Sequence, residues 1–185
     1  MTSPRTILGI DPGTNILGFG VIRVNAAGKP EYVDCGVLDL RKIPDPYSKL
    51  ANIYDSISEL CEKYSPDDVA LESPFLDKNA QVIFKLGRAQ GAAMIAGIRS
   101  GAEIYEYAPR KAKIAICGNG AASKEQVALM VGKTLGTEIE APYKDATDAL
   151  AIAICHFYQL SSPLKGAGAA STWKKFIQDN PDRIK

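Results

Sequence analysis

The amino-acid sequence predicts an α/β fold in which helices flank a five-stranded mixed sheet. Strand-like segments joined by short turns fill the first forty residues, a pattern typical of an antiparallel meander. Strand-like and helix-like segments alternate after that, which is typical of parallel strands linked through helices. The 185 residues are 46% hydrophobic and 23% charged, which suits one globular domain with a sizeable core.

The meander is predicted from three apolar runs and two turns. Residues 6–10 are β-branched and apolar, and they end in the turn-forming sequence DPGTN at 11–15. Strand character resumes over 17–24, so these two runs form a hairpin. A second turn over 25–30 leads to a third strand over 32–40.

Helices and strands alternate in the middle of the chain. Apolar residues at spacings of three and four predict a helix over 50–64, and short strands are predicted over 68–72 and 103–106. A long helix is predicted over 79–98. It contains three glycines, which predict close packing against another element because glycine destabilises a helix interior: Gly87, Gly91 and Gly97.

The last part of the core is predicted to be helical. Pro109 opens a short helix that ends near residue 116, and the capping-box sequence SKEQ at 123–126 starts another. A final core helix begins near Asp145 and reaches about residue 160. We therefore expect one domain over 1–160, followed by a Ser/Gly/Ala-rich linker and a tail over 161–185.

Bulk properties narrow the classes of function. The net charge of +1 means that any nucleic-acid binding must come from a local basic patch. No apolar run is long enough to cross a membrane and no signal-peptide pattern is visible, so a cytoplasmic protein is expected. We expect His156 to be structural. Four cysteines without zinc-ligand spacing are expected to be reduced thiols: Cys35, Cys61, Cys117 and Cys155.

Four acidic residues are candidates for chemistry. Asp11 and Glu72 each end an apolar strand, whereas Asp145 and Asp148 share one face at a helix start. Singly, each has an ordinary explanation as a turn former, a strand terminus or a helix-dipole partner. Together, they would need cations, and oxygen ligands suit Mg²⁺ or Mn²⁺. Two such ions about 4 Å apart promote phosphoryl transfer, so the set, if it assembles, predicts phosphodiester chemistry.

Four groups of residues appear in order over about residues 5–160. They are GIDPGT at 9–14 with GFGVI at 18–22, LE at 71–72 with NA at 79–80, LGRAQG at 86–91, and DATDALAIA at 145–153. In this combination they resemble the RuvC family of Holliday-junction resolvases. The first group alone is shared with actin-like kinases, but the four together are specific.

The resemblance implies a ribonuclease-H-like fold and a homodimer with two active sites, for which the helix at 79–98 is the implied contact surface. It implies Mg²⁺-dependent (or Mn²⁺-dependent), paired, symmetric cleavage of four-way junction DNA, leaving 5′-phosphate and 3′-hydroxyl ends. A branch-migration motor is an implied partner. Asp11, Glu72, Asp145 and Asp148 match the family's catalytic, metal-binding acids.

The resemblance also indicates DNA-binding residues. Phe75 matches an aromatic that stacks on junction bases, although a partly buried loop aromatic is the ordinary alternative. Lys113 and Lys124 match basic residues that contact DNA phosphates. Arg110 and Lys111 extend this patch or belong to a solvated charged face.

Three other functions are kept as alternatives. A related ribonuclease-H-like nuclease acting on another nucleic-acid structure would use the same acids. A catalytically inactive junction-binding module would keep the fold, but the intact carboxylates argue against it. An actin-like ATPase, suggested by residues 11–14 alone, needs two lobes and a second phosphate loop, and this chain has room for one lobe.

Overall fold

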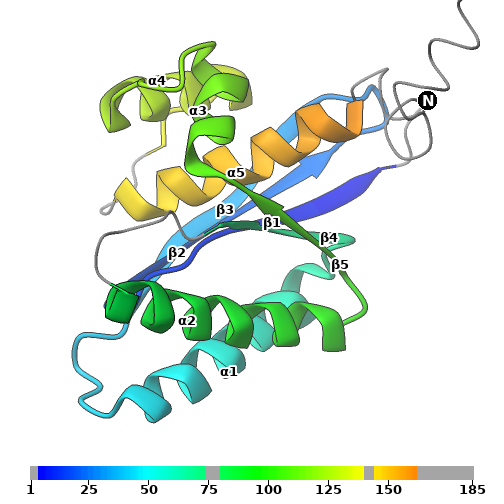
Figure 1. Ribbon diagram of the computed structural model, residues 1–185. Coiled ribbons are helices and arrows are strands. Elements are labelled where there is room, and N and C mark those ends of the chain that lie inside the picture. The colour runs from blue at the N-terminus through cyan, green and yellow to red at the C-terminus, as the bar shows by residue number, and fades with distance from the viewer. Residues whose placement is uncertain (1–3, 74–79, 140–143, 162–185) are drawn as a thin grey trace, which may run out of the picture.

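Five strands form one mixed sheet in the order β3-β2-β1-β4-β5 (Figure 1). The computed structural model describes residues 4–73, 80–139 and 144–161. Strands β1, β2 and β3 are antiparallel neighbours, and β4 and β5 run parallel to β1, as the sequence predicted. The strands are β1 (Arg5–Asp11), β2 (Ile16–Val24), β3 (Pro30–Asp39), β4 (Asp68–Glu72) and β5 (Glu103–Tyr107).

Helices cover both faces of the sheet (Figure 1). Helices α1 and α2 build one hydrophobic core against β1, β2 and β4, whereas α3, α4 and α5 contribute to a second core on the other face. The central strands are therefore buried on both sides. The helices are α1 (Pro46–Tyr64), α2 (Ala80–Arg99), α3 (Pro109–Cys117), α4 (Lys124–Leu135) and α5 (Lys144–Ser161).

Helix α5 lies unusually close to the sheet because β1 and β2 present glycines beneath it. A Cβ atom on Gly9 would lie 2.1 Å from the carbonyl oxygen of Ala149, and one on Gly18 would lie 2.1 Å from that of Asp145. Real side chains do not fit at such distances. The first turn of α5 is thus held over the sheet edge at which β1 ends.

Most helix boundaries fall within a few residues of the prediction, and α1 differs most. It begins at Pro46 because the side chain of Asp45 accepts a hydrogen bond from the Ser48 amide. The predicted capping box of α4 is confirmed, with Ser123 and Gln126 bonding reciprocally.

Within this chain, one of the three α2 glycines packs closely against another element. Gly97 faces the sheet, where a Cβ would meet Ile104 and Val69. Gly87 and Gly91 have no described atoms in the space that a Cβ would fill, because they lie on the outer side of α2. Close packing against an element of the same chain is therefore confirmed for Gly97, and for Gly87 and Gly91 the predicted packing stays a prediction.

The remaining interior residues behave as ordinary core components. All four cysteines are free thiols. His156 is buried, with its Nδ1 2.6 Å from the Tyr107 hydroxyl and its Nε2 3.2 Å from Asp68.

No helix in the described segments is long and apolar enough to span a membrane. The predictions for Phe75 and for the linker and tail after Ser161 concern residues outside those described.

Candidate active site

The predicted acidic residues meet at one edge of the sheet. Asp11 ends β1 and Glu72 ends the adjacent parallel strand β4, whose register pairs Ile10 with Leu71. The first turns of α5 add Asp145 and Asp148. Carboxylate oxygens of Asp11, Asp145 and Asp148 lie within 4.8 Å of one another, a spacing that could hold a metal ion. Glu72 lies outside that tight group but close enough to affect it electrostatically.

The pKa values of Asp11 and Glu72 show that the clustered carboxylates interact strongly. Burial raises the pKa of Asp11 from 3.8 to about 8, and the negative charges of the neighbouring carboxylates add to this effect. Burial, followed by the charge of Asp148, raises the pKa of Glu72 from 4.5 to about 7. Without a cation, the cluster therefore retains protons near neutral pH. A divalent cation would favour the ionised forms, so this donor set fits an oxygen-ligated metal.

Two of the four predicted basic residues border the carboxylates. The Lys124 Nζ lies 2.6 Å from Asp148 Oδ2, and its charge opposes the rise in the pKa values of Asp11 and Glu72. Lys113, on α3, also acts to lower the pKa of Glu72. Helices α3 and α4 thus place positive charge along one side of the acidic cluster.

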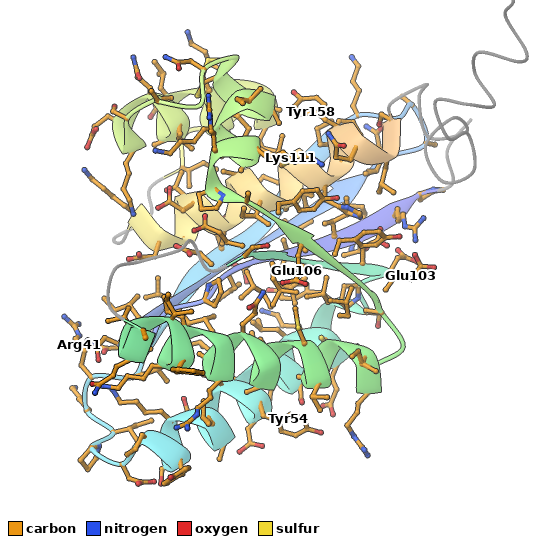
Figure 2. All side chains as sticks on the ribbon, in the orientation of Figure 1. Arg41, Tyr54, Glu103, Glu106, Lys111 and Tyr158 are labelled. Carbon is orange, nitrogen blue, oxygen red and sulfur yellow. The ribbon has the colours of Figure 1, made fainter. Side chains whose placement is uncertain are left out.

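The other two basic residues point elsewhere. Arg110 packs along Gly120 in the connection between α3 and α4. The Lys111 Nζ lies 5.1 Å from the centroid of the Tyr107 ring (Lys111 is labelled in Figure 2). Within the described segments, neither residue forms an ion pair with the acidic cluster.

One buried polar residue next to the site was not singled out from the sequence. Gln90, on the sheet-facing side of α2, donates a 2.6 Å hydrogen bond from Nε2 to Glu106 Oε1 and lies 3.5 Å from the Glu72 carbonyl oxygen. It therefore links α2 to the ends of β4 and β5. The available signal was a glutamine at a position where the helical period expects an apolar side chain.

A five-stranded sheet in this order, with an acidic cluster where β1 and β4 end, defines a nuclease of the ribonuclease-H-like class. Comparison with known proteins is more specific. The family described as "Crossover junction endodeoxyribonuclease RuvC" matches residues 7–156. The chain belongs to this family of endodeoxyribonucleases, and the predicted resemblance is confirmed.

Curated relatives support the assignment over nearly the whole chain. The protein named crossover junction endodeoxyribonuclease RuvC from Bacteroides fragilis is 49% identical, with 98% of this chain and 96% of the relative covered. The protein of the same name from Cytophaga hutchinsonii is 45% identical, with 100% and 90% covered.

Solved structures confirm the fold. Thermus thermophilus RuvC is 33% identical, with a TM-score of 0.75 over 84% of this chain and 96% of that one. The same protein in complex with a Holliday junction substrate is 34% identical, with a TM-score of 0.77 over 84% and 94%. A yeast mitochondrial Holliday junction resolvase, 16% identical with a TM-score of 0.61, shares the fold.

Proposed function

We propose that this protein resolves Holliday junctions by metal-dependent, paired and symmetric cleavage of phosphodiester bonds, leaving 5′-phosphate and 3′-hydroxyl ends. The observation that carries the proposal is the convergence of Asp11, Asp145 and Asp148, with Glu72 beside them, in a chain of the RuvC family. A relative that is 34% identical over most of its length was solved with a Holliday junction substrate.

The residues proposed to hold the metal are the same four carboxylates. Two Mg²⁺ ions per site, replaceable by Mn²⁺, match an all-oxygen donor set. When bound, such ions lower the pKa of water and stabilise charge at a phosphoryl group undergoing in-line displacement. The raised pKa values of Asp11 and Glu72 support metal binding here, because they mean that the protein's own positive charges do not balance the carboxylates.

The protein's own groups then position the substrate. Lys113 and Lys124 border the carboxylates and are proposed to bind phosphate oxygens near the cleaved bond. The ion pair of Lys124 with Asp148 fixes the orientation of that carboxylate. Arg110 and Lys111 are proposed to contact phosphates farther along the DNA, and Phe75 to stack on junction bases.

Paired cleavage requires two active sites, and the outer face of α2 is the proposed contact between two copies of the chain. Phe84, Ile95 and Ile98 are 71%, 51% and 55% exposed there, an unusual concentration of apolar surface. Gly87 and Gly91 lie on the same side and would allow a second helix to approach closely.

Three further proposals come from the sequence, and of these the partner rests on the family resemblance alone. Residues 1–160 form the nuclease domain, and 161–185 form a linker and tail without catalytic residues. A branch-migration motor is a partner. The protein acts in the cytoplasm.

The proposal is tested with a labelled mobile four-way junction in Mg²⁺, beside a linear duplex and an RNA–DNA hybrid of matching sequence. We expect symmetric nicks in opposing strands of the junction that DNA ligase reseals, and none with Asp11→Asn. Preferential cutting of the hybrid would instead make the protein a ribonuclease of the same fold. Equal cutting by Asp11→Asn would refute the assigned site.

A further inference from the structure

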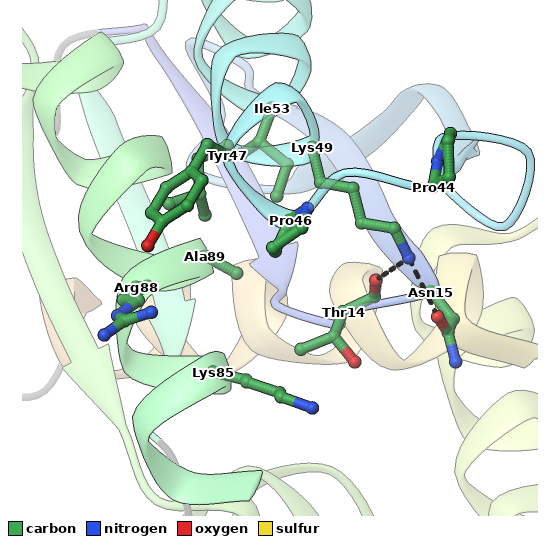
Figure 3. A pocket seen from close by; sticks show the side chains of 11 residues that line it. Thr14, Asn15, Pro44, Pro46, Tyr47, Lys49, Ile53, Lys85, Arg88 and Ala89 are labelled. Atoms are coloured by element: carbon green, nitrogen blue, oxygen red, sulfur yellow. Dashed lines mark hydrogen bonds between the residues drawn. The ribbon is translucent and has the colours of Figure 1, made fainter. Parts of the chain in front are cut away.

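A basic pocket lies beside the active site, on the opposite face of the sheet from α5. It has a volume of about 370 Å³ and is lined by the turn between β1 and β2 and by the N-terminal halves of α1 and α2 (Figure 3). Its lining includes Thr14, three residues after Asp11 in the chain. The pocket and the acidic cluster are therefore on two sides of one short turn.

The described residues that line the pocket carry three positive charges and no negative one. Lys49 comes from α1, and Lys85 and Arg88, three residues apart, come from one side of α2. In the part of the chain that the structure describes, no aspartate or glutamate lines the pocket. None of the three cations forms an ion pair within the segments that the structure describes. Like charges gathered without a counter-charge repel each other, so an anionic ligand would stabilise the arrangement.

Lys49 connects this pocket to the catalytic strand. Its Nζ donates hydrogen bonds of 3.0 Å to the Thr14 carbonyl oxygen and 3.1 Å to Asn15 Oδ1 (dashed in Figure 3). Both acceptors are uncharged, so they supply no counter-charge to the ammonium, and one of its three donors is left for a ligand. An anion held here is thus fixed in position relative to Asp11.

The wall of the pocket favours a nucleic-acid strand over a small inorganic ion. Tyr47, at the start of α1, lines the pocket with a side chain that is 70% exposed. Exposed aromatic rings beside cations are typical of surfaces that bind nucleotides, because a base or sugar packs on the ring while the phosphate meets the charge.

We infer that this pocket binds a backbone phosphate of the junction DNA, on the strand that passes through the active site, a few nucleotides from the cleaved bond. The inference rests on the proposed function, since it assumes that DNA reaches the acidic cluster. It adds Lys49, Lys85 and Arg88 as phosphate-binding residues and Tyr47 as a packing surface for the adjacent nucleotide.

The test is the salt dependence of junction binding by the full chain, measured by fluorescence anisotropy in EDTA so that no cleavage occurs. The double variant Lys85→Gln/Arg88→Gln should bind about tenfold more weakly near physiological salt. The slope of log K against log salt should fall by about one, the effect of losing one phosphate contact. The single variant Lys85→Gln should show a smaller change in the same direction.

A matched control removes the same charge elsewhere. The double variant Lys29→Gln/Arg99→Gln alters the turn between β2 and β3 and the far end of α2, both exposed. It should bind like the unchanged protein. Tyr47→Ala should weaken binding without changing the slope, because it removes packing and not charge, and Tyr47→Phe should restore it.

The possible failures are distinguishable. If the unchanged protein does not bind the junction, the proposed function fails, and the inference with it. If it binds and Lys85→Gln/Arg88→Gln has the affinity and slope of its control, the inference is overturned while the proposed function stands. If that variant loses only thermal stabilisation by inorganic phosphate, with junction binding unchanged, the pocket is an anion site unrelated to DNA and the inference is again wrong.

Discussion

Replacing Asp11 by asparagine should stabilise the metal-free protein at alkaline pH while abolishing its activity. The pKa of the Asp11 carboxyl is raised from 3.8 to about 8, so in the unfolded chain the group ionises at a much lower pH than in the folded protein. Between these values the unfolded state binds fewer protons, and folding stability falls as pH rises. Below pH 4 Asp11 is protonated in both the folded and the unfolded protein, and it no longer destabilises the fold.

The size of the effect follows from the same shift. Each pKa unit is worth about 1.4 kcal/mol, so the full shift corresponds to several kcal/mol at pH 8. Relaxation of the site and the coupled titration of Glu72 reduce this destabilisation. We therefore expect Asp11→Asn to add roughly 2–4 kcal/mol to the free energy of unfolding at pH 8. Near pH 4 the difference should be close to zero.

The assay is urea denaturation in EDTA across pH 4–8.5, followed by the same series in Mg²⁺. In Mg²⁺ the unchanged protein should regain stability, because the ion binds the folded state, whereas Asp11→Asn should gain much less. Parallel pH profiles for the two proteins in EDTA would refute the reasoning, since they would mean that Asp11 is ionised at no cost in the fold.

Four further substitutions test other parts of the account. Gly18→Ala should reduce cleavage about a hundredfold with the fold retained by circular dichroism, because its Cβ would displace the Asp145 backbone and misplace the α5 carboxylates. Lys124→Ala should lower the single-turnover rate by roughly a hundredfold through the loss of one charged donor at the phosphate. Phe84→Glu should yield monomers in analytical ultracentrifugation and replace paired cuts by single nicks. Gln90→Leu should lower the free energy of unfolding by ~1–3 kcal/mol in urea titrations, because a buried hydrogen bond is lost.

Matched variants separate these effects from general damage. Lys133→Ala, at the other end of α4, should leave the cleavage rate unchanged, and Leu129→Glu places the same charge on another exposed apolar side chain without altering the oligomeric state. Full activity of Gly18→Ala would show that the close approach of α5 to the sheet is not required. Dimers of Phe84→Glu that still cut in pairs would exclude the outer face of α2 as the contact.

Half of the acidic cluster could be predicted from local sequence, because apolar runs show where the strands end. Asp11 and Glu72 each terminate an apolar run, so their carboxylates would meet if the two strands were neighbours, and the structure pairs β1 with β4. The placement of Asp145 depends on the distance between α5 and the sheet. Gly9 and Gly18, which are far from Asp145 in the sequence, set this distance. That distance is a property of packing, and no local pattern encodes it.

The positions of the basic residues in space could not be predicted from their positions in the sequence. Lys111 and Lys113 are two residues apart and were assigned to one patch, but on a helix two positions differ by about 200°. Lys113 therefore lies near Glu72, whereas Lys111 lies over Tyr107. The basic pocket was not predicted at all, because its cations come from two different helices, with Lys49 more than thirty residues before Lys85, and each looks like an ordinary surface charge.

The central claim is that the four carboxylates form one metal-binding catalytic site, and the most direct measurement is X-ray diffraction from crystals soaked in Mn²⁺, recorded at the manganese edge. We expect anomalous peaks bonded to Asp11 and flanked by Asp145, Asp148 and Glu72, and their loss in Asp11→Asn crystals. Manganese bound elsewhere in the chain, or peaks that persist unchanged in Asp11→Asn, would contradict the account.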